Sequence, residues 1–427
     1  MKIEQLHSLF LKCNSVSTDT RKIQEGDMYF ALKGETFNGN TFAQEALKKG
    51  AQYVLIDEKE FQFSSQTILV DDVLKTLQEL ASYHRTFLNL SIIAITGSNG
   101  KTTTKELINA TLSKKYQTVA TIGNLNNHIG VPLTLLSMDK TTEIGIVEMG
   151  ANHLTEIAFL CKIAKPDYGY ITNFGKAHLE GFGSLKGVIK GKTELYNYLI
   201  NNDKTIFVNA NDAIQVEKVK DSKHVVSFGS DQSNLLIELS SISPYVIVKF
   251  KEIKIQSQLI GEYNFNNISA AIAIASYFKV EDEGIKTAIE SYLPKNNRSQ
   301  IIEKGTNKII LDAYNANPTS MTAALLNFEK QNDKFKVAIL GDMFELGNEA
   351  EKEHQNIADF ASTLLIDKAI LIGENFSKTK IVSPKVMIFN SFEDFKNSEV
   401  ISGLNNYSLL IKGSRGMALE RVLDLIQ

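Results

Sequence analysis

The pattern of hydrophobic and polar positions changes twice along the chain. In roughly the first ninety residues, short apolar runs such as 28–32 are followed by turn signals, and a helical pattern covers 41–49 before Gly50. This mixture of short strands and a short helix predicts a small α/β domain.

Longer apolar runs dominate the second stretch of the chain. Runs typical of buried strands occur at 90–95, 144–147 and 206–208, with helical patterns between them, which predicts a mostly parallel sheet. Between 240 and 258 the pattern shortens and alternates, which favours an antiparallel hairpin attached to that sheet, and an alanine-rich helix is expected at 267–278.

A polar segment at 293–297 breaks both periodicities and marks the last predicted boundary. After it, a strand–helix rhythm restarts and predicts a second doubly wound unit. The strands expected there are 308–311, 337–340, 369–372 and 409–411.

The whole chain is therefore expected to be an α/β protein of three domains. Its 427 residues exceed the size of a single hydrophobic core, which supports several domains. The predicted domains are residues 1–88, 89–296 and 297–427.

Composition narrows the class of protein. Hydrophobic residues make up 43% and charged residues 22%, as in folded globular proteins. A net charge of −3 with interspersed signs argues against nucleic-acid binding. The N-terminus does not resemble a signal peptide and no apolar window reaches membrane-spanning length, so a cytoplasmic protein without membrane insertion is expected. Cys13 and Cys161 are expected to be ordinary reduced thiols.

The sharpest local signal is the glycine-rich segment 96–104, TGSNGKTTT, between the apolar run 90–95 and a helical pattern that begins near Thr102. Glycines let backbone N–H groups approach phosphate oxygens, a helix N-terminus favours negative charge, and Lys101 adds a cation. Ile95 stands where the general phosphate-loop pattern has its first glycine. The alternative, a glycine turn without a ligand, does not explain the lysine and threonines, so ATP or a similar nucleotide is predicted.

The short form T-G-x-N-G-K-T resembles the phosphate loop of the Mur ligase family. Further segments resemble motifs of that family in the same order: 124–132, 148–153, 173–183, 190–194 and 261–267. Three more resemble the branch of the family that adds D-alanyl-D-alanine: 31–39, 312–318 and 341–347.

The resemblance implies the architecture and the reaction. The expected domains are a small N-terminal substrate domain, a central ATPase-type domain and a C-terminal Rossmann-like domain. A carboxylate of UDP-N-acetylmuramoyl-tripeptide would attack the γ-phosphate of ATP, and the amine of D-alanyl-D-alanine would displace the acyl phosphate. Two unit charges 4 Å apart repel by roughly 4 kcal/mol at an effective dielectric near 20, so Lys101 and Mg²⁺ are needed to offset this repulsion.

The resemblance also assigns catalytic and metal-binding residues. Thr102 and Glu148 would hold one Mg²⁺, and His178 would serve a second; considered alone, Glu148 could be a capping acid and His178 a loop histidine bonded to backbone. Histidine is an uncommon Mg²⁺ ligand, so the His178 assignment depends on its motif. Lys192 matches a lysine that is carbamylated in the family. An ordinary lysine is only about 0.04% neutral at pH 7, so burial or nearby cations must lower its pKa.

The resemblance also implies which residues contact the nucleotide and the substrate. Adenine would lie near Asn264 and Asn267, and the phosphates and ribose near Arg298 and Asp312, although Asn264 could simply cap a helix. The full set implied for ATP is Thr96, Gly97, Ser98, Asn99, Gly100, Lys101, Thr102, Thr103, Asn264, Asn267, Arg298 and Asp312. The set implied for the precursor is Asp19, Thr20, Arg21, Lys33, Asn126, Asn127 and Asn315. Segment 412–415 could be a turn or could position the dipeptide.

Two other functions stay open at this point. A sister Mur-type or folylpolyglutamate-type ligase would keep the phosphate loop and change the substrates. A regulatory phosphate-loop NTPase would leave the 312–318 and 341–347 motifs unexplained. The expected partners are the two small-molecule substrates, with the protein acting as a monomer. No general base stands out, and no residue pattern identifies the third residue of the acceptor peptide.

Overall fold

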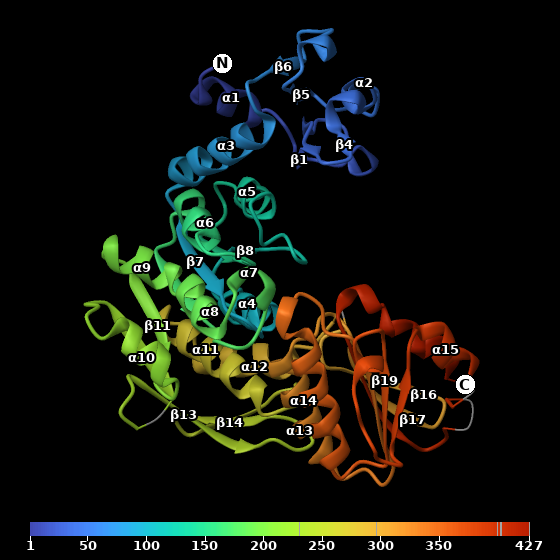
Figure 1. Cartoon of the computed structure of the whole chain (residues 1–427). Coiled ribbons are helices and arrows are strands. Elements are labelled where there is room, and N and C mark those ends of the chain that lie inside the picture. Colours follow the sequence, from blue (N-terminus) through green and yellow to red (C-terminus); the bar gives the residue numbers. More distant parts are fainter. Residues whose placement is uncertain (230, 296, 399, 402–403, 427) are drawn as a thin grey trace.

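Three α/β units follow one another along the chain, each built around its own sheet (Figure 1). The computed structural model describes residues 1–229, 231–295, 297–398, 400–401 and 404–426. The predicted α/β class with mostly parallel strands is confirmed. The predicted boundary residue 296 and the last residue, 427, lie outside the described residues, so the domain limits stay predictions.

The N-terminal unit contains a parallel sheet with the strand order β1-β2-β5-β6. Its elements are α1 (Ile3–Phe10), β1 (Val16–Ser17), η1 (Thr20–Lys22), β2 (Met28–Phe30), β3 (Lys33–Gly34), β4 (Phe37–Asn38), η2 (Gly39–Phe42), α2 (Ala43–Lys48), β5 (Tyr53–Ile56), η3 (Lys59–Phe61), β6 (Thr67–Leu69) and α3 (Val73–Leu88). Strand β2 is buried along its whole length, which explains its continuous apolar run.

The central unit holds a nine-stranded sheet with the order β15-β14-β13-β12-β11-β10-β7-β9-β8. Its elements are β7 (Ser91–Thr96), α4 (Lys101–Leu112), β8 (Thr118–Ala120), α5 (Gly130–Leu136), β9 (Ile144–Glu148), α6 (Glu156–Ala164), β10 (Tyr168–Ile171), α7 (Leu179–Phe182), α8 (Leu185–Lys192), α9 (Glu194–Asn201), β11 (Thr205–Asn209), α10 (Ala213–Val219), β12 (Val225–Gly229), β13 (Leu235–Ser241), β14 (Ile247–Phe250), β15 (Ile253–Gln256), α11 (Tyr263–Tyr277) and α12 (Asp282–Ser291). Strands β13, β14 and β15 pair antiparallel, as predicted, while β7 to β12 pair in parallel.

The C-terminal unit has a six-stranded sheet with the order β16-β17-β21-β18-β19-β20, antiparallel only between β16 and β17. Its elements are β16 (Gln300–Lys304), β17 (Asn307–Asp312), α13 (Pro318–Glu329), β18 (Lys336–Gly341), η4 (Gly347–Glu349), α14 (Ala350–Thr363), β19 (Lys368–Ile372), η5 (Phe376–Lys378), β20 (Val386–Phe389), α15 (Phe392–Asn397), β21 (Ser408–Lys412), η6 (Arg415–Met417) and η7 (Leu419–Leu425). The four predicted strands are present; β16 and β20, at the two edges, were not predicted.

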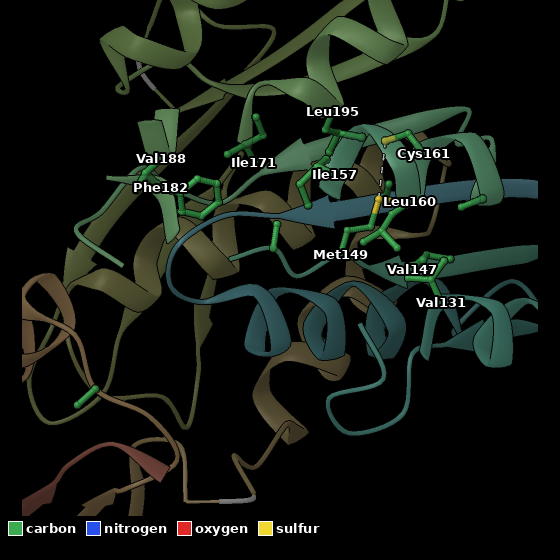
Figure 2. Close-up of a cluster of buried hydrophobic side chains, with 14 of the residues drawn as sticks. Val131, Val147, Met149, Ile157, Leu160, Cys161, Ile171, Phe182, Val188 and Leu195 are labelled. Carbon is green, nitrogen blue, oxygen red and sulfur yellow. Dashed lines mark hydrogen bonds between the residues drawn. The ribbon is translucent and has the colours of Figure 1, made fainter. Parts of the chain in front are cut away.

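A buried apolar cluster fixes the part of the central unit that carries the site (Figure 2). Met149 follows strand β9, and its sulfur lies 3.8 Å from the sulfur of Cys161 on α6. Phe182 and Val188 bring α7 and α8 into the same cluster. The ends of β9 and α8, which carry Glu148 and Lys192, are therefore held against one packed core.

Helix α3 connects the N-terminal and central units and packs against α5 and α6. His84 on α3 contacts His7 on α1 through ring nitrogens 2.9 Å apart, and its other ring nitrogen lies 2.9 Å from the carbonyl oxygen of Met138. Among the described helices, none combines the length and apolar character that a bilayer crossing needs.

Candidate active site

The phosphate loop joins β7 to α4, as predicted, and its two glycines are sterically required. Gly97 and Gly100 have φ angles of 142° and 78°. A Cβ atom on Gly97 would lie 2.0 Å from the hydroxyl oxygen of Thr172, and one on Gly100 would lie 2.6 Å from Oδ1 of Asn267. Only glycine therefore fits where the loop packs against Thr172 and Asn267. The loop leads into the N-terminus of α4, which favours a phosphate group.

A cavity of about 630 Å³ lies where the phosphate loop faces the C-terminal unit. It brings together most of the residues predicted for nucleotide, metal and substrate. Those that line it are Ser98, Asn99, Gly100, Lys101, Thr102, Thr103, Asn126, Asn127, Glu148, His178, Asn264, Asn267, Arg298, Asp312 and Asn315. Thr96, the last residue of β7, and Gly97, which follows it, do not line the cavity.

Lys101 places its ammonium group over the loop. Its Nζ donates to the carbonyl oxygens of Gly97 and Ser98, at 2.7 and 3.3 Å. Burial lowers the pKa of Lys101, and the nearby carboxylate of Glu148 opposes that shift. The cation thus lies at the wall where phosphate oxygens would bind.

Glu148 ends strand β9 with its side chain buried in the cavity wall. One carboxylate oxygen, Oε1, accepts a hydrogen bond from the amide of Asn126 at 2.8 Å. The other, Oε2, has no hydrogen-bond partner among the described residues. A buried carboxylate oxygen without a partner is costly, so this atom is suited to a cation.

The side chains around Glu148 fit a magnesium site built mainly from nucleotide oxygens. Thr102, also buried, lines the same cavity. Within the described part of the chain, no group of three or more His, Cys, Asp or Glu side chains could hold a metal by itself. Mg²⁺ commonly uses one or two protein ligands together with phosphates and water, so one carboxylate and one hydroxyl are sufficient.

Lys192, the last residue of α8, is completely buried behind the cavity rather than in its lining. Its Nζ donates to the carbonyl of Ala151 at 3.0 Å and lies 5.2 Å from the ring centroid of Phe182. Burial, followed by the positive charge of Lys101, lowers the pKa of Lys192 well below its ordinary value; Glu156 and Glu194 oppose the shift. The depressed pKa that carbamylation requires is present, and carbamylation itself stays a prediction.

His178 contacts an acidic residue of the C-terminal unit that the sequence did not single out. Nδ1 of His178 lies 2.5 Å from Oε2 of Glu345, and the backbone N–H of Glu180 donates to the carbonyl of Glu345 at 3.1 Å. The imidazole lowers the pKa of the Glu345 carboxyl. The motif 341–347 was recognised, but nothing local indicated that Glu345 would reach a residue so distant in sequence.

The two asparagines predicted near adenine are already part of an internal network. The amide of Asn264 donates to the carbonyl of Ile260, and that of Asn267 donates to Oδ1 of Asn264, both at 2.8 Å. Thr104, on α4, donates to Oδ1 of Asn267 at 3.0 Å. Asn264 lies inside α11 rather than at its cap, so the capping alternative is wrong. The pair braces α11 against the phosphate-loop helix.

Arg298 and Asp312 lie at the entry to the C-terminal unit and line the cavity, and their contacts with phosphate and ribose stay a prediction. The guanidinium of Arg298 lies over the ring of Tyr314, with 3.6 Å between its central carbon and the ring centroid. Asp312 accepts from Nζ of Lys412 at 2.6 Å and from the backbone N–H of Ser299 at 3.1 Å. Lys412 is therefore more than a turn residue, because it fixes Asp312 at the cavity wall.

The residues predicted to bind the uridine diphosphate end lie in the N-terminal unit, outside the cavity. Arg21 forms an ion pair with Asp19 at 2.8 Å, next to Thr20, where η1 begins. Lys33 lies 3.0 Å from a carboxylate oxygen of Asp57. Their role in binding the precursor stays a prediction.

Contacts between the central and C-terminal units were missed entirely. The amide of Asn317 donates to Oδ1 of Asn99 at 2.7 Å, and the backbone N–H of Lys176 donates to the hydroxyl of Thr319 at 2.9 Å. Nζ of Lys176 also lies 2.5 Å from Oε1 of Glu353. These residues are more than 140 positions apart in sequence, so no local pattern could pair them.

Known protein families match nearly the whole chain. Residues 12–85 match the Mur ligase family catalytic domain, residues 95–275 the Mur ligase middle domain, and residues 297–403 the Mur ligase glutamate ligase domain. The UDP-N-acetylmuramoyl-tripeptide–D-alanyl-D-alanine ligase of Bacillus subtilis is 33% identical, over 97% of this chain and 93% of the relative. The enzyme of the same name from Escherichia coli is 32% identical, over 99% and 96%.

Solved structures give the same result. MurF from Acinetobacter baumannii superposes with a TM-score of 0.87 at 30% identity, covering 99% of this chain and 98% of that one. MurF ligase from Thermotoga maritima in complex with ADP superposes with a TM-score of 0.85 at 26% identity, covering 97% of both chains. The sequence matches, the three-unit architecture and the phosphate-loop cavity agree, and the chain belongs to the Mur ligase family.

Proposed function

We propose that this chain is an ATP-dependent ligase that joins D-alanyl-D-alanine to UDP-N-acetylmuramoyl-tripeptide, giving the pentapeptide precursor of peptidoglycan, ADP and phosphate. The observation that carries the proposal is the cavity where the phosphate loop meets Asp312, residues 314–317 and Glu345 of the C-terminal unit. A regulatory NTPase does not require that convergence. The relatives that bear this activity in their names, at 32–33% identity over nearly their full length, support the choice among Mur-type ligases.

In the proposed first step, ATP lies on the phosphate loop and the tripeptide carboxylate attacks its γ-phosphate. The N-terminus of α4 and Lys101 reduce the repulsion between the two anions. Glu148 and Thr102 would hold Mg²⁺, which would add positive charge at the phosphate oxygens. The amine of D-alanyl-D-alanine then displaces phosphate from the acyl phosphate and forms the amide bond.

Lys192 has a separate proposed role. A buried lysine that is neutral can capture carbon dioxide, and the resulting carbamate is an anion. Next to Lys101 and behind Ala151, such an anion would be favoured by the local positive charge. Together with His178 it would help to hold a second Mg²⁺ near the substrate carboxylate.

The remaining substrate contacts are also proposals. Asp19, Thr20, Arg21 and Lys33 would bind the uridine diphosphate end of the precursor. Asn126, Asn127 and Asn315, which line the cavity, would contact its reactive end or the dipeptide. Both partners are small molecules, and we expect a cytoplasmic monomer that binds no nucleic acid.

The decisive experiment is a reconstitution with purified protein, ATP, Mg²⁺, the UDP-linked tripeptide and D-alanyl-D-alanine. Phosphate release is followed and the product is identified by mass, with each substrate omitted in turn. Lys101→Ala should abolish turnover, whereas Lys190→Ala, at an exposed position on α8, should not. Phosphate release that needs neither substrate would support the NTPase instead, and ligation of a different amino acid or acceptor would support a sister ligase.

A further inference from the structure

Four acidic residues line the cavity, and three of them are engaged within their own unit. Glu148 accepts from Asn126, and Glu156 accepts the backbone N–H groups of Asn152 and His153 at 2.7 and 3.2 Å. Asp312 is paired with Lys412. The fourth, Glu345, comes from the loop after β18 in the C-terminal unit and reaches His178 in the central unit. Its side chain thus links two units at the wall of the reaction chamber.

The geometry of this contact determines which imidazole nitrogen faces the carboxylate. Oε2 of Glu345 and Nδ1 of His178 are 2.5 Å apart, although Nδ1 makes no well-aligned hydrogen bond among the described residues. A carboxylate can only accept, so this close contact is attractive only when Nδ1 carries the ring hydrogen. The other ring nitrogen, Nε2, is then the available lone pair of a neutral His178.

Both partners are held by their backbones as well. His178 and Glu345 each adopt a left-handed conformation, with φ angles of 51° and 61°. The N–H of Glu180 donates to the carbonyl of Glu345 at 3.1 Å, and a Cβ atom on Gly347 would lie 3.2 Å from Cα of Glu180. Beyond His178, α7 is anchored by Phe182 in the buried cluster (Figure 2). The loop 341–347 is therefore seated closely on residues 178–180, and the side-chain contact depends on that seating.

We propose that Glu345 is a positioning residue that acts through His178: when the C-terminal unit docks, its carboxylate orients the imidazole so that Nε2 is free for a ligand in the cavity. Carboxylates that accept the second ring N–H of a histidine commonly fix its orientation and tautomer in this way. Here the carboxylate and the histidine belong to different units, so His178 is fully oriented only in the docked arrangement. The inference rests on the proposed function, in which His178 serves the second Mg²⁺.

The test compares Glu345→Ala and Glu345→Gln with a matched control, Glu353→Gln. Glu353 also joins the two units, through Lys176, but its ion pair does not include His178. In the full-length protein labelled with ¹⁵N-histidine, ring signals of His178, identified by their loss in His178→Gln, report the tautomer. The Mg²⁺ concentration that gives half-maximal ligation is measured on the same proteins.

Glu345→Ala should shift the His178 ring signals away from the Nδ1–H form and raise the half-maximal Mg²⁺ concentration about 10- to 100-fold. Glu345→Gln keeps an acceptor oxygen and should give a smaller change in both readouts. Glu353→Gln should leave both unchanged. Unaltered His178 signals in Glu345→Ala, or equal effects of Glu353→Gln, would overturn the inference. If the wild-type protein forms no amide, the proposed function fails, while the ring signals still decide whether Glu345 orients His178.

Discussion

The side-chain amide of Asn317 donates a hydrogen bond to Oδ1 of Asn99 at 2.7 Å and so connects the N-terminal cap of α13 to the phosphate loop. The same side chain caps α13, because its Oδ1 accepts the backbone N–H of Ser320 at 2.9 Å. One residue therefore stabilises a helix in the C-terminal unit and touches the nucleotide loop of the central unit.

These two roles of Asn317 can be separated by substitution. Serine is also a good helix cap but is too short to reach Asn99, so Asn317→Ser should keep the stability and lower kcat/KM roughly three- to tenfold. Asn317→Ala should show the same kinetic loss and also lose about 1 kcal/mol of unfolding free energy. Urea unfolding and steady-state kinetics on both variants measure this; full activity in Asn317→Ser would show that the bridge to Asn99 is unimportant.

Lys192→Met should uncouple activity from stability. Methionine fills a similar volume without burying an amine, so we expect the melting temperature to stay the same or rise. Ligation should fall about 100-fold or more, because the group proposed to form the carbamate is lost. Lys190→Met, on the exposed face of the same helix, is the control and should keep its activity. Retained ligation in Lys192→Met would remove Lys192 from the mechanism.

The histidine pair between α1 and α3 should make stability depend on pH. Burial, followed by the neighbouring His84, lowers the pKa of His7 to about 4, and burial also lowers the pKa of His84. The folded state therefore prefers neutral rings, while the unfolded chain takes up protons near its ordinary pKa of about 6.5. The contribution to stability is complete above about pH 6.5 and is lost as the pH falls toward 4.

Unfolding free energies at about pH 7.5 and about pH 5 test this dependence. We expect a decrease on the order of 1–2 kcal/mol at the lower pH from His7, and His84 should act in the same direction. His7→Gln keeps an N–H donor toward His84 but does not titrate, so it should lose less stability over the same interval. Equal losses in the two proteins would show that His7 does not cause the dependence.

The two cysteines should be nearly inert toward thiol reagents in the folded protein. Burial, followed by Asp27, raises the pKa of Cys13 to about 11, so only about 0.1% is thiolate at pH 8. Burial raises the pKa of Cys161 still further above its ordinary value. A chromogenic disulfide reagent should therefore react slowly before denaturant is added and with two thiols afterwards. Rapid reaction of the native protein would contradict the half-buried position of Cys13 and the buried position of Cys161.

Secondary-structure elements that depend on residues close together in the chain were predictable from the sequence. The strand, glycine loop and helix around 91–112 follow from an apolar run, two glycines and a helical pattern that are contiguous. Edge strands β16 and β20 were missed, because their residues are mostly half-buried and give no continuous buried run. Helix α11 begins at Tyr263, four residues before the predicted start, because the asparagines in its first turn are residues that favour turns and caps over helix interiors.

The candidate site was predictable only in part, and the reason is again physical. Lys190 and Lys192 are the same residue type and lie two positions apart on α8. Lys190 is nevertheless exposed, whereas Lys192 is completely buried. The Glu345–His178 and Asn317–Asn99 contacts form because the central and C-terminal units pack against each other. The hydrophobic periodicity of the sequence does not predict how two units pack. The motif segments that carry the family resemblance contain most of the cavity-lining residues, but the contacts of those residues came from the structure.

The crowding around Gly97 and Gly100 also limits how this loop can change. Neighbouring oxygens leave no space for a methyl group at either position, and both residues have positive φ angles. Every other amino acid is therefore disfavoured for two reasons, steric overlap and backbone strain. In a library of all single substitutions selected for function, these two positions should remain glycine. An inhibitor whose affinity came from the backbone of residues 97–100 would therefore meet a surface that point mutation cannot reshape without also destroying the nucleotide site.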